Sequence, residues 1–178
     1  MNVSCKFKYT ETVTRNVFAA IIEDDTHPDL RIIVKFAKTY SVEVHNFYYN
    51  LIVAPQLYSC QSIGPYFMVV MEQLEGTILA EISSLSIQEA QQIESVFLCC
   101  MVYVLTIKVI QKAVNKAVSE GLVHGDLRAP NILITNDGPK IIDFDWSGKE
   151  GEVRYPIDLS MSNEWPEGGI SLFQCINS

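Results

Sequence analysis

The chain has 178 residues, of which 48% are apolar, so it can fold around a packed interior and is not a disordered chain. A formal net charge of −8 argues against nucleic acid and anionic membranes as default partners. The five cysteines include no CxxC pair, and their scattered positions indicate a reducing, cytoplasmic environment. No apolar run follows Lys6 and Lys8 near the N-terminus, so we expect no secretory signal peptide.

Strand-forming residues dominate the first part of the chain. The β-branched and aromatic stretches 13–22 and 30–36 predict two strands, joined by the polar connection 23–29. Lys35 lies at the end of the second stretch. Taken alone, a lysine in that place is typical of a strand end whose side chain reaches out to solvent.

A helix and a further strand follow. Residues 40–51 carry apolar side chains at helical spacing, which predicts a helix that stops before Pro55. Glu43 lies in its first turn, where the helix dipole favours an acidic side chain. The short apolar run 66–71 is typical of a buried strand.

The next predicted helix is unusual in length and composition. Ser86 and Glu89 form a capping box that predicts its start, and Gly121 is the next strong helix stop. A helix spanning that whole distance is too long for a domain of this size. Within it, segment 96–110 has no polar face and only Lys108 as a charged residue. Three interpretations stay open. The segment could be a buried helix, or a membrane-inserted hairpin, although its length is below the roughly 20 residues of a membrane span. The third interpretation, which the composition favours, is a segment foreign to the fold, such as a retained intron.

The stretch 122–146 combines residue types that magnesium-assisted phosphoryl transfer needs. Asp126 and Asn131 lie on one loop, and Asp143 follows a predicted hairpin over 132–144. Because a hairpin brings its two ends together, we expect Asp143 to return beside that loop. One carboxylate can then accept a hydroxyl proton, while a second carboxylate and an amide supply the hard oxygen ligands that Mg²⁺ prefers.

The motifs HGDLRAPN at 124–131 and DFD at 143–145 resemble the catalytic core of the protein-kinase-like superfamily, where HxDxxxxN is followed by a hairpin and DFG. The variants HGD and DFD look more like the small-molecule branch of aminoglycoside and choline kinases. HGDLRAPNIL with IIDFDWSGKEG looks most like the short protein-kinase-like proteins of fungi. Two motifs joined by a hairpin of the right length are a far more specific match than a single HxD.

The resemblance implies an α+β, two-lobed kinase-like fold that is incomplete. Residues 1–74 would form the small lobe, with an antiparallel sheet and one helix but without a glycine-rich loop. Residues 75–178 would form a reduced helical large lobe with the catalytic hairpin and the DFD motif, and segment 96–110 would be its possible foreign insertion.

The resemblance also implies roles in catalysis. Asp126 would accept the proton of the attacking hydroxyl and orient it, and Arg128 would offset charge on the transferred phosphoryl group. Asn131 and Asp143 would hold the Mg²⁺ ions. Asp145, in place of the usual glycine, would be a further ligand or a solvated turn residue.

The resemblance implies that residues in the first part of the chain bind the nucleotide. Lys35 would pair with the α and β phosphates of ATP, and Glu43 would form a salt bridge with Lys35. Glu72 and Leu74 would belong to a hinge over 71–74, whose backbone groups bind the adenine edge.

The front of the chain departs from the family pattern, because its first glycine is Gly64 and no GxGxxG precedes the strands. Without glycines, the backbone does not approach phosphates closely. An N-terminal part that is missing, a lid of different construction, or weak nucleotide binding would each explain this.

The resemblance predicts an ATP-dependent phosphotransferase that moves the γ-phosphate to a hydroxyl of a protein or a small molecule. We expect it to be cytoplasmic and to have no nucleic-acid or membrane partner. The alternative is a pseudokinase or truncated kinase fragment that serves as a nucleotide-binding or scaffolding module.

Overall fold

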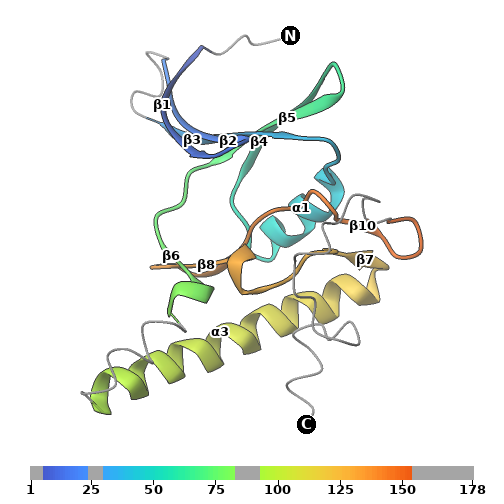
Figure 1. The fold of residues 1–178 in the computed structure, drawn as a ribbon. Helices are drawn as coiled ribbons and strands as arrows, with labels where there is room; N and C mark the ends of the chain where they lie inside the picture. The colour runs from blue at the N-terminus through green and yellow to red at the C-terminus, as the bar shows by residue number, and fades with distance from the viewer. Residues whose placement is uncertain (1–5, 24–29, 83–92, 154–178) are drawn as a thin grey trace.

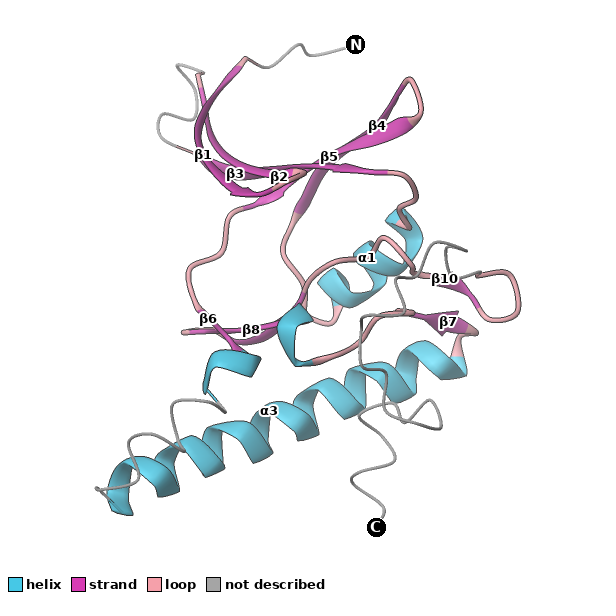
Figure 2. Ribbon diagram, in the orientation of Figure 1, coloured by secondary structure: helices cyan, strands magenta, loops and turns pink. Residues whose placement is uncertain are grey.

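The computed structural model describes residues 6–23, 30–82 and 93–153. In Figure 1 a sheet forms the upper part, helix α3 (Ile93–Ser119) lies at the bottom, and the segment that follows α3 folds between them. Figure 2 shows the same division, with strands gathered above and the long helix below. The architecture is α+β with an antiparallel sheet and few helices, as predicted, and is consistent with an incomplete kinase-like fold.

The upper sheet has five antiparallel strands in the order β1-β2-β3-β5-β4. Their bounds are β1 Phe7–Thr14, β2 Val17–Ile22, β3 Arg31–Ala37, β4 Leu57–Ile63 and β5 Tyr66–Glu72. The prediction of a single strand over 13–22 is wrong, because a turn at Arg15 and Asn16 divides it into β1 and β2. Asn favours such turns, since its short amide side chain tolerates turn conformations.

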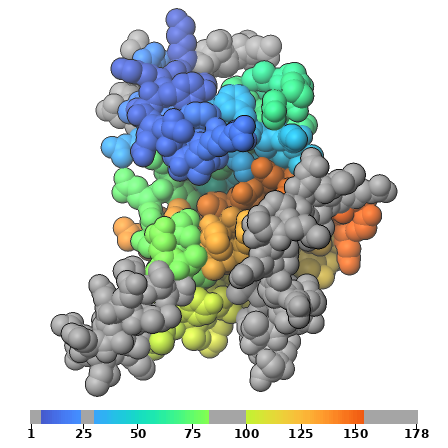
Figure 3. Space-filling view, viewed as in Figure 1, coloured from blue at the N-terminus to red at the C-terminus, as the bar shows by residue number. Residues whose placement is uncertain are grey.

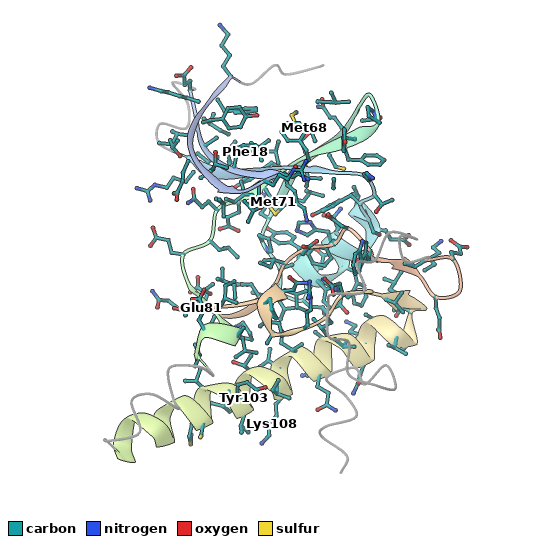
Figure 4. All side chains as sticks on the ribbon, viewed as in Figure 1. Phe18, Met68, Met71, Glu81, Tyr103 and Lys108 are labelled. Carbon is teal, nitrogen blue, oxygen red and sulfur yellow. The ribbon has the colours of Figure 1, made fainter. Side chains whose placement is uncertain are left out.

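The two faces of the sheet have different surroundings. Phe18 and Val34 are register partners on the outer face, whereas Lys35, next along β3, is on the inner face because side chains alternate along a strand. Figure 4 shows Phe18 and Met68 above the sheet and Met71 below it. The inner face, which carries Lys35, therefore looks toward the rest of the molecule.

Helix α1 (Val42–Asn50) matches the predicted helix over 40–51. It begins at Ser41, whose hydroxyl oxygen accepts the Val44 backbone N–H at 3.3 Å. Val44 and Tyr48 are fully buried in the cluster that also contains Phe144. This helix thus packs into the core of the lower part of the molecule, while buried residues of the sheet such as Ile32 and Val34 form a separate cluster.

The lower part contains two small sheets, ordered β6-β8-β9 and β10-β7. The bounds are β6 Thr77–Ile78, β7 Leu122–Val123, the 3-10 helix η1 Ala129–Asn131, β8 Ile132–Thr135, β9 Gly138–Ile141 and β10 Gly148–Lys149. The hairpin predicted over 132–144 is confirmed by the pairing of β8 with β9. Its second strand ends at Ile141 rather than Phe144, because Asp143 adopts a φ of 69°, which a strand does not accommodate.

Helix α3 runs through segment 96–110 without a break. It ends at Ser119, and Gly121 follows with a φ of 69°, as expected for the residue after a helix end. The capping box at Ser86 and Glu89 lies outside the described residues. The foreign origin of segment 96–110 remains a prediction.

The described part of α3 has two apolar faces. One packs on the core and includes Tyr103, Ile107, Ile110, Ala113 and Ala117. The other leaves Met101, Val104, Leu105 and Val109 exposed, which accounts for the missing polar face of segment 96–110. No helix in the described ranges is long and apolar enough to cross a membrane.

The loop between α1 and β4 is tied to β9. Lys140 Nζ donates to the Ile52 carbonyl at 2.9 Å, and the Ile141 N–H donates to the Val53 carbonyl at 2.7 Å. Ile52 has a φ of 63°. The residue is 72% exposed, so burial of its side chain contributes little to offset the cost of this conformation. A β-branched residue in this left-handed region is strained.

Replacing Ile52 with glycine should therefore stabilise the fold. We expect Ile52→Gly to raise the free energy of unfolding by about 1 kcal/mol in urea titrations, because glycine removes the left-handed strain. Ile63→Gly is the matched control, since Ile63 is also exposed but has no positive φ. The control should lose stability, and equal losses in both variants would show that Ile52 carries no strain.

Candidate active site

The carboxylates of the 143–145 motif meet the ammonium group of Lys35. Lys35 Nζ lies 2.8 Å from Asp143 Oδ1 and 2.7 Å from Asp145 Oδ1. Lys35 is only 9% exposed, so its ammonium group is largely shielded from solvent, whereas the Asp143 side chain is 38% exposed. The lysine therefore does not reach out to solvent, and it links β3 to the turn after β9.

The backbone shapes this turn. Asp143 has a φ of 69°, which is uncommon for a residue with a side chain. The Asp145 backbone N–H hydrogen-bonds the Asp143 carboxylate, and the Thr39 hydroxyl donates to the Asp145 carbonyl. The turn is thus held both by its own hydrogen bonds and by the segment that follows β3.

The two carboxylates differ in their affinity for a proton. Burial raises the pKa of Asp145; Lys35 opposes that rise, and repulsion from Asp143 adds to it. Burial alone would also raise the pKa of Asp143, but the Lys35 charge and the hydrogen bonds from Lys35 and Asp145 lower it. The environment therefore lowers the pKa of Asp143 and raises that of Asp145, so Asp143 is the more acidic member of the pair.

Asp126 is held by two neighbours on its own loop. Asn131 Nδ2 donates to the Asp126 carbonyl oxygen and to Asp126 Oδ2, both at 2.8 Å. Arg128 Nε lies 3.0 Å from Asp126 Oδ1, and the Asp126 side chain is 9% exposed against 50% for Arg128. Burial raises the pKa of Asp126, while Arg128 and Asn131 oppose that rise.

The loop and the hairpin end lie beside each other. The Ile142 N–H donates to the Asn131 carbonyl at 3.0 Å, and Asp143 is close enough to Asp126 to raise the pKa of that carboxyl further. The predicted residues Asp126, Asn131 and Asp143 are therefore brought together with Lys35. In Figure 3 the segments that carry them lie between the sheet and α3.

His124 connects the same two segments. Its Nε2 hydrogen-bonds the Ile142 carbonyl at 3.1 Å, and its Nδ1 accepts the Asp126 backbone N–H at 3.3 Å. Burial lowers the pKa of His124 to about 4, so the ring is neutral at pH 7 and offers one donor and one acceptor. His124 thus acts as a structural hydrogen-bonding residue.

Aromatic rings enclose Phe144, which is fully buried. The His45 ring stacks on it with centroids 4.5 Å apart and an interplanar angle of 14°, and His124 meets it edge-on at 5.0 Å. Tyr40 and Tyr48 also contact this ring. Sequence reasoning missed His45, because a single histidine on the buried face of a helix gives no distinctive signal.

The salt bridge predicted between Lys35 and Glu43 is not formed. Glu43 is exposed on α1, and both ion pairs of Lys35 go to Asp143 and Asp145. The reason is the orientation of α1, which buries Val44, His45 and Tyr48 and leaves Glu43 exposed.

The predicted hinge joins the sheet to the hairpin, as Figure 1 shows between β5 and β6. Glu72 ends β5, where its N–H donates to the Gln56 carbonyl at 2.9 Å and its Oε2 accepts the Gln56 N–H at 3.1 Å. Leu74 is half-buried. A Cβ on Gly76 would lie 2.3 Å from the Ile134 carbonyl oxygen, so a glycine is needed where the chain crosses β8.

Gly125 meets a similar constraint inside the HGD motif. Its φ is 81°, and a Cβ at this position would lie 2.1 Å from the Trp146 carbonyl oxygen. The loop therefore packs directly on the backbone that follows the DFD motif. The Ser147 hydroxyl adds a hydrogen bond to the His124 carbonyl at 2.8 Å.

Comparison with known proteins supports a kinase-like domain. A family model described as "RIO domain" matches residues 65–149, which include the whole of 122–146 but not Lys35. Serine/threonine-protein kinase PAK 5 of Rattus norvegicus is 32% identical over 89 residues, which are 49% of this chain and 11% of that protein. Serine/threonine-protein kinase PAK 4 of Homo sapiens is 30% identical over 90 residues, 50% of this chain and 14% of that protein.

The fold, the site and these matches together make this chain similar to protein-kinase-like domains. Within that class, the middle of the chain is similar to a RIO domain, a kinase-like domain, and more weakly to serine/threonine kinases. The chain spans only 11% to 14% of the length of the curated relatives named above. Phosphoryl transfer is therefore supported at the level of the superfamily.

The close approach at Gly125 yields a stability prediction. Gly125→Ala should lower the free energy of unfolding by about 2–4 kcal/mol, because the methyl group collides with backbone and the φ is positive. Gly64→Ala is the control, since its φ is 58° but nothing lies within 4 Å of the added Cβ. Urea titrations should show a loss of about 1 kcal/mol for the control. Equal losses would mean that the contact with Trp146 is not made.

Proposed function

We propose that this chain is an ATP-dependent phosphotransferase that moves the γ-phosphate of ATP to a hydroxyl of a protein or a small molecule. The observation that carries the proposal is the proximity of Asp126, Asn131 and Asp143 beside the buried Lys35. Phosphoryl transfer depends mainly on positioning and electrostatic stabilisation. A rigid group of one cation, two carboxylates and an amide is suited to that task.

Asp126 is the proposed acceptor of the hydroxyl proton. Its carboxylate is fixed by Asn131 and Arg128, so it would hold an attacking hydroxyl in a defined direction. Burial raises its pKa, which makes it a better proton acceptor than an ordinary surface carboxylate. Arg128, half-exposed at the edge of the loop, would offset negative charge on the transferred group.

Asn131 and Asp143 are the proposed ligands of Mg²⁺, and their chemistry fits this ion. The Asn131 amide nitrogen donates to Asp126, so the amide oxygen would be the atom that binds the ion, and the lowered pKa of Asp143 favours its anionic form. In the described ranges, no group of three or more His, Cys, Asp or Glu could hold a metal alone. ATP phosphates would therefore complete the coordination. When bound, the ion would neutralise charge on the phosphates.

Lys35 and the hinge are the proposed contacts to ATP. Lys35 lies on the inner face of the sheet and would pair with the α and β phosphates. Backbone groups between Glu72 and Leu74 would bind the adenine edge. This arrangement would hold the nucleotide between the sheet and the catalytic hairpin.

The HGD and DFD variants support a small-molecule acceptor and a place near the aminoglycoside and choline kinases and the short fungal kinase-like proteins. The matched serine/threonine-protein kinases support a protein acceptor instead. The scattered cysteines support a cytoplasmic setting in either case.

A nucleotide-binding or scaffolding module without turnover is the second candidate. It is favoured by the turn between β1 and β2, where Arg15 and Asn16 stand and no glycine allows close backbone approach to phosphates. Such a module would bind the nucleotide weakly and transfer nothing.

The two candidates separate in paired binding and turnover assays. Mg·ATP at a hundredfold excess over its Kd should stabilise the wild-type fold by about 2.7 kcal/mol, seen as a rise in Tm. Asp143→Asn should abolish this rise. Asp126→Asn should keep the rise but lower ATP turnover by roughly 10²-fold or more.

Asp137→Asn is the matched control, because Asp137 is exposed at the far turn of the same hairpin and loses the same charge. This control should behave as wild type in both assays. Equal turnover in wild type and Asp126→Asn would support the module without turnover. No rise in Tm with the wild type would contradict nucleotide binding altogether.

A further inference from the structure

The ammonium group of Lys35 obtains all of its described ion pairs from one motif. Both partners, Asp143 and Asp145, follow β9, and none comes from α1, where Glu43 is exposed. The face of α1 that is buried carries Val44, His45 and Tyr48 instead. The helix therefore closes on Phe144 with rings and offers no carboxylate to the lysine.

Asp145 is held from the side of the sheet as well as by its own turn. The Thr39 hydroxyl, just after β3, donates to the Asp145 carbonyl. Its Oδ1 atom is buried and accepts no aligned hydrogen bond from the described residues, so the contact with Lys35 at 2.7 Å is its principal stabilising interaction. A buried carboxylate oxygen of this kind depends on a nearby cation.

Asp143 and Asp145 would have different roles once a nucleotide is bound. Under the proposed function, Asp143 would be a ligand of Mg²⁺ and would share its negative charge between the ion and Lys35. A buried lysine is costly to maintain when it has too few anionic partners. Asp145 is placed to remain with Lys35 when the ion is bound.

We propose that Asp145 is a positioning residue that fixes the Lys35 ammonium group, the part predicted for Glu43 on the helix. This inference rests on the proposed function for its use in catalysis, but the contact itself exists without a nucleotide. The aspartate in the third position of the DFD motif thus replaces the helix carboxylate, and the lysine is positioned by the lower part of the molecule. If Asp145 were instead a solvated turn residue or a further metal ligand, it would not fix the position of the Lys35 ammonium group.

The first test needs no nucleotide and uses the intact chain. An amine-selective acylating reagent is applied at one pH, and modification of each lysine is followed by mass spectrometry. Asp145→Asn should speed modification of Lys35 by roughly tenfold, because the ammonium group loses one of its two carboxylate partners. Glu43→Gln should leave the rate unchanged.

Lys140 supplies an internal control, because it is also buried and its Nζ donates to the Ile52 carbonyl, away from Asp145. Its modification rate should stay constant in Asp145→Asn. A parallel rise at Lys140 would show general loosening and overturn the positioning role. So would a Lys35 rate that responds to Glu43→Gln and not to Asp145→Asn.

The second test measures the Kd of Mg·ATP in a double-mutant cycle. Asp145→Asn should weaken binding by roughly tenfold in wild type but have almost no effect in the Lys35→Met background, because its effect passes through the lysine. An undiminished effect in that background would point to direct metal ligation and overturn the inference. If wild type binds no Mg·ATP, the proposed function fails, while the lysine modification rates still decide whether Asp145 fixes Lys35.

Discussion

The contact of one buried ammonium group with two carboxylates organises this molecule. Lys35 comes from the inner face of the sheet, and Asp143 and Asp145 come from the turn after the β8–β9 hairpin. Such a shielded cluster stabilises the fold only if each charge stays paired, so it fixes the distance between the sheet and the hairpin. The aromatic rings around Phe144 hold the same turn against α1.

Backbone packing fixes the rest of the site. Gly125 brings its loop onto the Trp146 carbonyl, and Gly76 brings the hinge onto β8. His124, neutral because it is buried, hydrogen-bonds across from the loop to the strand. The Asp126 carboxylate then needs only its own neighbours on the loop to be held in place. The position of the Asp126 carboxylate therefore depends on packing contacts and hydrogen bonds of residues that have no proposed role in the reaction. These residues come from four separate segments of the chain.

The sequence predicted the parts of this arrangement that are local. The hairpin and the proximity of Asp126, Asn131 and Asp143 follow from short-range turn geometry and motif spacing. The lysine partner was not predictable in the same way, because the choice between Glu43 and Asp145 depends on how α1 is rotated against the hairpin. The division of 13–22 was missed since Arg15 and Asn16 interrupt a β-branched run only weakly. The course of α3 through 96–110 depends on packing with the core, which composition alone does not reveal.

The most direct test of the account asks where a divalent ion settles when a nucleotide is present. Mn²⁺, added with a non-hydrolysable ATP analogue, broadens the NMR signals of nearby groups through its unpaired electrons. We expect broadening of the Asn131 side-chain amide and of the backbone amides around Asp126 and Asp143. Excess Mg²⁺ should reverse it, and the Asp137 amide at the far turn should be much less affected. Broadening centred elsewhere, or equal at Asp137 and Asp143, would contradict convergence of these residues on one metal-bound nucleotide.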